Sequence, residues 1–167
     1  EQMMVGSKGL TDKTTAHDYQ HMYHRYLAPL AKRTCLEDQT TNVIRILEIG
    51  LGCHVSGGMI RGTPGGSALA WRHLFPSSAF ELDLHLIEFD EDCAVKWADA
   101  HKDDAHVHVG DASNREDLER VLQESGGGPF DVIIDDGSHI NSHQIFAMEF
   151  LIEHVAPGGI YVVEDIH

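Results

Sequence analysis

The chain has 167 residues, 42% apolar and 23% charged, the composition of one globular domain large enough to bury a core. Its 12 basic and 27 acidic residues give a net charge of −15, which argues against nucleic acid or a membrane as a partner. No apolar run reaches the length of a membrane span and no leader opens the chain, so we expect a cytoplasmic protein.

Residues 1–42 form an N-terminal segment with one amphipathic helix predicted from residue 14 to about residue 31. Apolar residues at helical spacing give it an aromatic stripe that should pack on an apolar surface: Tyr19, Met22, Tyr23, Tyr26, Leu27 and Leu30. On another face, His17, His21 and His24 have a spacing that could hold Zn²⁺, although a solvated polar face is the commoner explanation.

Residues 43–167 predict alternating strands and helices. Short runs rich in β-branched residues are typical of strands buried on both faces of a parallel sheet. Five such runs occur, at residues 43–49, 84–87, 106–109, 132–134 and 160–163. Helices are predicted between them, at residues 67–75, 91–100, 113–125 and 141–155. This order predicts an α/β fold, a doubly wound parallel sheet with five strands and an N-terminal helix.

For two of these helices, the sequence also predicts the N-terminal cap or the face that packs on the sheet. Ser113 and Glu116 have the spacing of a capping box at the start of the third helix. In the fourth helix, apolar residues at helical spacing should face the sheet: Ile145, Met148, Ile152 and Val155.

The three cysteines, Cys35, Cys53 and Cys93, are too few and too scattered for a disulfide framework or a zinc motif. Their number agrees with a reducing compartment.

The turn after the first strand and the acid after the second indicate a ligand site. Gly50 and Gly52 would let the backbone approach a ligand closely. Glu88 ends the second strand, where an acid usually binds a ribose diol. A dinucleotide site is less well supported, because Val55 stands where a third glycine is expected and Glu88 lies well beyond the usual spacing of about 20 residues.

Carboxylates follow the last two strands of the predicted sheet. Asp136 follows one, and Glu164 and Asp165 follow the next, so a single crossover should bring the three together. Clustered carboxylates repel one another unless a cation lies between them, and oxygen ligands suit Mg²⁺. The alternative is that such acids cap helices or face solvent, which we favour for Asp135 alone.

Several motifs resemble those of class I S-adenosylmethionine-dependent methyltransferases. Residues 47–52, 87–90 and 110–111 resemble the family's first three motifs, and residues 157–159 resemble the turn before its fifth strand. The loop at residues 53–66 is longer than the family usually carries. This resemblance implies a Rossmann-like methyltransferase fold that binds S-adenosylmethionine.

The last third is more specific, because residues 131–139 together with residues 163–165 resemble the metal-dependent O-methyltransferases of macrolide sugars, of the mycinamicin and macrocin type. The resemblance extends from about Asp12, where Asp12, Lys13 and the tyrosine-rich helix resemble the family's substrate side, to the end of the chain.

The resemblance implies a role for each matching residue. Glu48, Gly50 and Gly52 would approach the methionine part of S-adenosylmethionine, Glu88 its ribose hydroxyls and Asp111 its adenine amine. Residues at the other end of the site would hold Mg²⁺: Asp136, Glu164 and Asp165.

His139 falls at the position of the family's catalytic base, and a neutral imidazole is suited to removing a hydroxyl proton near pH 7. The alternative is that His139 only adjoins the start of the following helix.

The predicted function is Mg²⁺-assisted O-methylation of a hydroxyl on a small molecule such as a sugar or polyketide. The family's sheet has two further strands, whereas this chain runs from Glu1 to His167, so we expect a fragment. One alternative is a non-catalytic cofactor-binding remnant or partner subunit, and a weaker one is a nicotinamide oxidoreductase. The expected partner is a hydroxylated small-molecule acceptor, with homo-oligomerisation left open.

Overall fold

The computed structural model describes Thr11, Lys13 and residues 18–36, 43–53, 64–76 and 80–166. Five parallel strands form one sheet in the order β3-β2-β1-β4-β5. The strands are β1 (Val43–Ile49), β2 (Glu81–Glu88), β3 (His106–Val109), β4 (Phe130–Asp135) and β5 (Val155–Val163). The helices are α2 (Gln20–Leu36), α3 (Gly66–Leu74), α4 (Glu91–Ala100), α5 (Arg115–Glu124), α6 (Asn141–Leu151) and the 3₁₀ turn η2 (Ile152–His154). The predicted α/β fold is confirmed.

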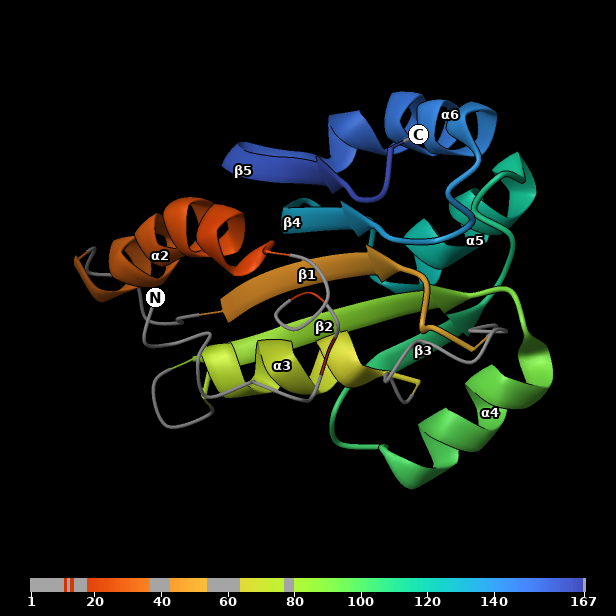
Figure 1. Cartoon of the computed structure of the whole chain (residues 1–167), viewed down its shortest axis with the longest axis horizontal. Coiled ribbons are helices and arrows are strands. Elements are labelled where there is room, and N and C mark those ends of the chain that lie inside the picture. Colours follow the sequence, from red (N-terminus) through yellow and green to blue (C-terminus); the bar gives the residue numbers. More distant parts are fainter. Residues whose placement is uncertain are drawn as a thin grey trace.

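Helices cover both faces of the sheet (Figure 1). On one face, the side chains of α2, α3 and α4 pack with β1, β2 and β4 around the fully buried Trp71. On the other face, α5 and α6 pack with the alternate residues of β1 and β4, around Phe130 and Ile133. Both faces of the central strands are therefore apolar, which explains their β-branched runs without polar alternation.

The strand order reverses between β1 and β4, so these two strands form the switch point of the sheet. Ile49 lies beside Asp135, and the backbone N–H of Asp136 donates to the carbonyl of Ile49 at 3.0 Å. In open α/β sheets, ligands bind outside the carboxyl ends of the strands at such a point. The residues that follow β1, β2, β4 and β5 therefore position the candidate site.

The predicted capping box at α5 is wrong. Asn114 is the N-cap, and its side-chain oxygen accepts from the backbone N–H groups of Glu116 at 2.8 Å and Asp117 at 3.3 Å. The helix begins one residue later than predicted, so its N-cap is Asn114 instead of Ser113. Ser113 instead donates to the carboxylate of Asp111 through its N–H and its hydroxyl.

The predicted inner face of α6 is also wrong. Gln144, Ala147 and Leu151 are buried, whereas Ile145 is 53% exposed and Met148 and Ile152 are exposed as well. The amide of Gln144 donates to the backbone carbonyl of Glu164 at 2.9 Å, a bond that fixes the rotation of the helix. Val155, predicted to belong to this helix, begins β5 instead.

Helix α2 packs on the sheet through Tyr23, Leu27 and Leu30, as the stripe predicts, while Tyr26 is 49% exposed. Of the proposed zinc face, His21 and His24 are exposed and His17 lies outside the described residues. No described helix is both long and apolar enough to cross a bilayer.

Candidate active site

The carboxyl ends of β1, β4 and β5 place acidic side chains side by side around Lys13. Its ammonium lies 2.5 Å from Asp136 Oδ2, 2.7 Å from Glu164 Oε2 and 3.6 Å from Glu48 Oε1. The lysine side chain is only 2% exposed, and Glu48 and Glu164 are similarly buried. A fixed positive charge therefore lies among acids from three strands.

Charge and burial set the protonation of this cluster. Burial opposes the charge on Lys13, but the carboxylates of Glu48, Asp136 and Glu164 outweigh it and raise the lysine pKa. Burial raises the pKa of Glu164 to about 7 despite the attraction of Lys13. Tyr23 donates its hydroxyl to Glu164 Oε1, so both oxygens of this carboxylate already have a partner.

A second group lies beside the first. One oxygen or nitrogen atom from each of Asp136, His139 and Asp165 lies within 4.8 Å of the others, close enough to share a metal ion. Nε2 of His139 is 3.8 Å from Asp165 Oδ2, and Tyr19 donates its hydroxyl to Asp165 Oδ1 at 2.7 Å. Partial burial and this bond raise the pKa of Tyr19 to about 12, so the phenol stays a donor.

The backbone at two of these residues is unusual. His139 and Asp165 have φ values of 55° and 51°, and they are the non-glycine residues with positive φ in the described part of the chain. A left-handed conformation is costly for side chains other than glycine, and such strain concentrates at functional sites. Here the two strained residues are the ones whose side chains face each other.

The structure brings Asp136, His139 and Asp165 into one group, with Glu164 adjacent. The donor set suits a hard divalent ion, since Asp136 and Asp165 supply carboxylate oxygens at a partly exposed position. Glu164 would join them only by giving up its bond to Lys13 or to Tyr23. Its place among the metal ligands therefore stays a prediction, as do those of Asp136 and Asp165.

Glu48 lies near the carboxyl end of β1, where its side chain is buried. The indole N–H of Trp71 donates to Glu48 Oε2 at 2.8 Å. Burial is the main cause of a raised Glu48 pKa, and Lys13 opposes it. Glu48 Oε1 has no hydrogen-bond partner although it is buried, which leaves an acceptor for a further donor.

The glycine turn after β1 adjoins this cluster. Gly50 has φ = 101°, and a Cβ placed on it would lie 2.3 Å from the backbone oxygen of Asp136. Only glycine therefore permits this close approach of the two loops. Gly52 also has positive φ, 80°, and is exposed.

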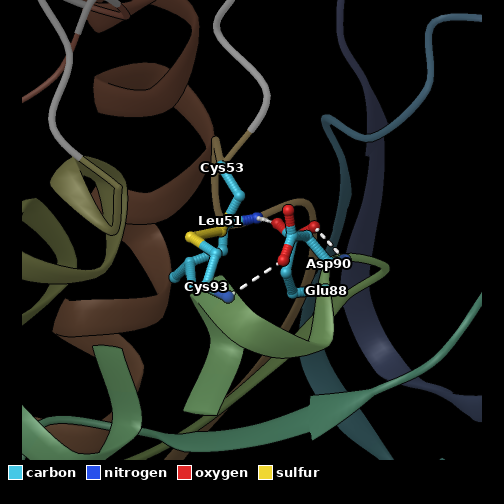
Figure 2. The surroundings of a disulfide bond; sticks show 5 residues. All are labelled: Leu51, Cys53, Glu88, Asp90 and Cys93. Carbon is cyan, nitrogen blue, oxygen red and sulfur yellow. Dashed lines mark hydrogen bonds between the residues drawn. A yellow bond between two sulfur atoms is a disulfide. The ribbon is translucent and has the colours of Figure 1, made fainter. Parts of the chain in front are cut away.

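Glu88 connects this turn to the loop after β2. Its Oε2 accepts from the N–H of Leu51 at 3.0 Å and its Oε1 from the N–H of Asp90 at 2.8 Å, as Figure 2 shows. Asp111 follows β3 at the same edge, and its Oδ1 accepts two bonds from Ser113. Both acids are thus held in place by neighbouring groups, and their roles toward a cofactor stay predictions.

The structure pairs Cys53 with Cys93 in a disulfide, whose Cα atoms are 6.0 Å apart (Figure 2). The cysteine count argued against a disulfide framework and did not predict this single bond. The two cysteines are 40 residues apart in sequence, and only the parallel pairing of β1 with β2 brings their loops together.

Sequence reasoning assigned no site role to Lys13, Tyr19 or Tyr23, although it placed Lys13 and the tyrosine-rich helix on the family's substrate side. One signal was available: buried tyrosine hydroxyls need partners, and clustered acids need a cation. The separation of Lys13 from Asp136 along the chain kept the two from being linked.

Comparisons with known proteins bear on the family and the fold of the chain. No protein-family model matches the chain. It is 36% identical over 134 residues to mycinamicin VI 2''-O-methyltransferase of Micromonospora griseorubida, covering 77% of this chain and 29% of that enzyme. It is 31% identical over 157 residues to 8-demethyl-8-alpha-L-rhamnosyl tetracenomycin-C 2'-O-methyltransferase of Streptomyces olivaceus, covering 93% of this chain and 35% of that enzyme.

Among solved structures, the MycE methyltransferase in complex with Mg, SAH and mycinamycin VI superposes with a TM-score of 0.69 at 28% identity. The match covers 90% of this chain and 35% of that one. The chain thus spans about a third of the length of these relatives. The predicted resemblance to sugar O-methyltransferases is confirmed, and so is the Rossmann-like methyltransferase fold.

Proposed function

We propose that this chain, a relative of the macrolide and sugar O-methyltransferases in sequence and fold, is the S-adenosylmethionine-binding part of a metal-assisted O-methyltransferase. The observation that carries the proposal is the convergence of Asp136, His139 and Asp165 at the carboxyl ends of β4 and β5, beside the switch point of the sheet. Its relatives are named as O-methyltransferases of mycinamicin VI and of a rhamnosyl tetracenomycin. A hydroxyl on a sugar of such a molecule is the proposed acceptor.

S-adenosylmethionine would bind along the carboxyl edge. Glu48, whose buried Oε1 lies 3.6 Å from the Lys13 ammonium and accepts no hydrogen bond, is suited to accept from the methionine ammonium, and Gly50 and Gly52 leave room for the cofactor. Glu88 and Asp111 would face the ribose hydroxyls and the adenine amine. The sulfonium of this cofactor supplies the methyl group.

Asp136 and Asp165 would hold Mg²⁺, with Glu164 as the third carboxylate. A divalent ion at this position lowers the pKa of a hydroxyl bound to it. The MycE complex is named as containing Mg, which supports Mg²⁺ over other divalent ions at this site.

His139 would act as the base. Nε2 is the ring nitrogen on the side of Asp165, and it accepts the proton of the acceptor hydroxyl. Asp165 then stabilises the imidazolium, while Tyr19 holds the carboxylate of Asp165 in place. The sulfonium of S-adenosylmethionine would supply the methyl group to the oxygen that His139 deprotonates.

The test measures transfer of labelled methyl groups from S-adenosylmethionine to a macrolide sugar with a free vicinal diol, with Mg²⁺ or with excess chelator. Transfer with Mg²⁺ that is lost with chelator supports the proposal. Transfer indifferent to chelator removes the metal from it. Binding of S-adenosylmethionine without transfer to any acceptor favours a non-catalytic cofactor-binding unit instead.

A further inference from the structure

The disulfide joins two loops of the proposed cofactor site. Cys53 directly follows Gly50, Leu51 and Gly52, and Cys93 lies in the first turn of α4, a few residues after Glu88 (Figure 2). On the proposed function, the first loop approaches the methionine part of S-adenosylmethionine and the second binds its ribose. A single covalent bond therefore fixes the distance between two parts of one binding site.

Hydrogen bonds also connect these two loops. Glu88 accepts from the backbone of Leu51 in the first loop and of Asp90 in the second. Asp90 in turn accepts from the N–H of Cys93 at 2.9 Å, as the N-cap of α4. The orientation of the Glu88 carboxylate thus depends on both loops keeping their relative position.

Both cysteines are half-buried. The third cysteine, Cys35, belongs to α2 and takes no part in the bond. The pair is therefore a discrete site at which oxidation or reduction changes the covalent structure of the cofactor loops.

We propose that Cys53 and Cys93 form a thiol–disulfide exchange site that controls the affinity for S-adenosylmethionine, with a dithiol reductant as its reaction partner. This inference rests on the proposed function. One thiolate of the reductant attacks a sulfur of the pair, and the sulfur–sulfur bond of the chain breaks to give a mixed disulfide. The second thiolate of the reductant then displaces the chain, so the chain gains two electrons and two protons and the reductant becomes a disulfide.

The oxidised form is the tighter binder. Its loops are already held at their binding distance, whereas the reduced chain must order them when the cofactor enters. Ordering about one loop residue on binding corresponds to roughly a tenfold loss of affinity.

The experiment compares the binding of S-adenosylhomocysteine by calorimetry for the oxidised chain and for the chain reduced with dithiothreitol. The expected result is about tenfold weaker binding after reduction. Double replacement C53S/C93S should bind as weakly as the reduced chain and ignore the reductant. The matched control C35S should keep the full response.

Circular dichroism establishes that each form is folded, and C53A with C93V replaces the serine pair if that pair unfolds. Equal affinity of the oxidised and reduced chains overturns the exchange site and leaves the proposed function intact. A double variant that still responds to the reductant also overturns it. Absence of binding in both forms overturns the proposed function, and this inference with it.

Discussion

Replacement of Lys13 by Met tests the buried charge cluster most sharply. The ammonium is 2% exposed and has hydrogen bonds to Asp136 and Glu164, with Glu48 at 3.6 Å. Methionine keeps the length of the side chain and removes the charge. Loss of one partner from a buried ion pair costs about 3 to 5 kcal/mol, because the other partner is left uncompensated.

The pH dependence of this loss follows from proton uptake. Wild-type Glu164 already holds a proton up to about pH 7, so below that pH the loss of Lys13 leaves little additional charge on this carboxylate. Above pH 7 the wild-type glutamate ionises beside Lys13, whereas in Lys13→Met it must stay protonated or remain as an uncompensated buried charge. The free energy of unfolding of Lys13→Met should therefore fall below wild type by more at pH 8, up to about 3 to 5 kcal/mol, than at pH 5.5.

Urea unfolding, followed by the fluorescence of buried Trp71, measures both values. Lys102→Met is the matched control, because the Lys102 side chain is 73% exposed and its ion pair with Asp99 lies on the surface. We expect the control to change stability by less than about 0.5 kcal/mol. A Lys13→Met loss below about 1 kcal/mol at pH 8, or one that is equal at both pH values, would refute the reasoning.

Three further predictions concern neighbouring parts of the site. Because burial raises the pKa of Glu164 to about 7, the folded state holds its proton above the ordinary value, so wild-type stability should decline by about 3 kcal/mol from pH 4.5 to 7. Glu164→Gln should flatten this decline in urea titrations, and an unchanged slope would contradict it. Reducing the disulfide, which spans a separation of 40 residues, should lower the free energy of unfolding by about 4 kcal/mol, whereas a loss under about 1 kcal/mol would not fit. His139→Gln should slow methyl transfer about 10²- to 10⁴-fold with S-adenosylhomocysteine affinity unchanged in calorimetry, and near-normal transfer would exclude it as the base.

The helices and strands predicted best from the sequence are those whose bounds are set by nearby residues. β1, β3 and α4 have the predicted bounds, and α4 begins where the side chain of Asp90 caps it locally. The clustering of the acids at the strand ends could also be predicted, because parallel strands bring their carboxyl ends to one edge of the sheet.

Other features depend on contacts between distant parts of the chain. The inner face of α6 is set by one polar bond, from Gln144 to the backbone of Glu164, which outweighs an apolar pattern on the outside of the helix. The disulfide depends on strand pairing, and a count of three cysteines carries no information on it. Lys13 lies 123 residues before Asp136 in the sequence, so only the folded structure brings the two together.

Binding of Mn²⁺ as a probe for Mg²⁺ tests the central claim most directly. Electron paramagnetic resonance of free Mn²⁺, with S-adenosylhomocysteine present, would be compared for wild type, Asp136→Asn, Asp165→Asn and the control Asp99→Asn, whose side chain is 73% exposed. We expect one Mn²⁺ site in wild type and in the control, with an affinity at least about tenfold weaker in the other two variants. A wild-type chain that binds no Mn²⁺, or Asp136→Asn and Asp165→Asn chains that bind it as tightly as wild type, would contradict the proposed metal site.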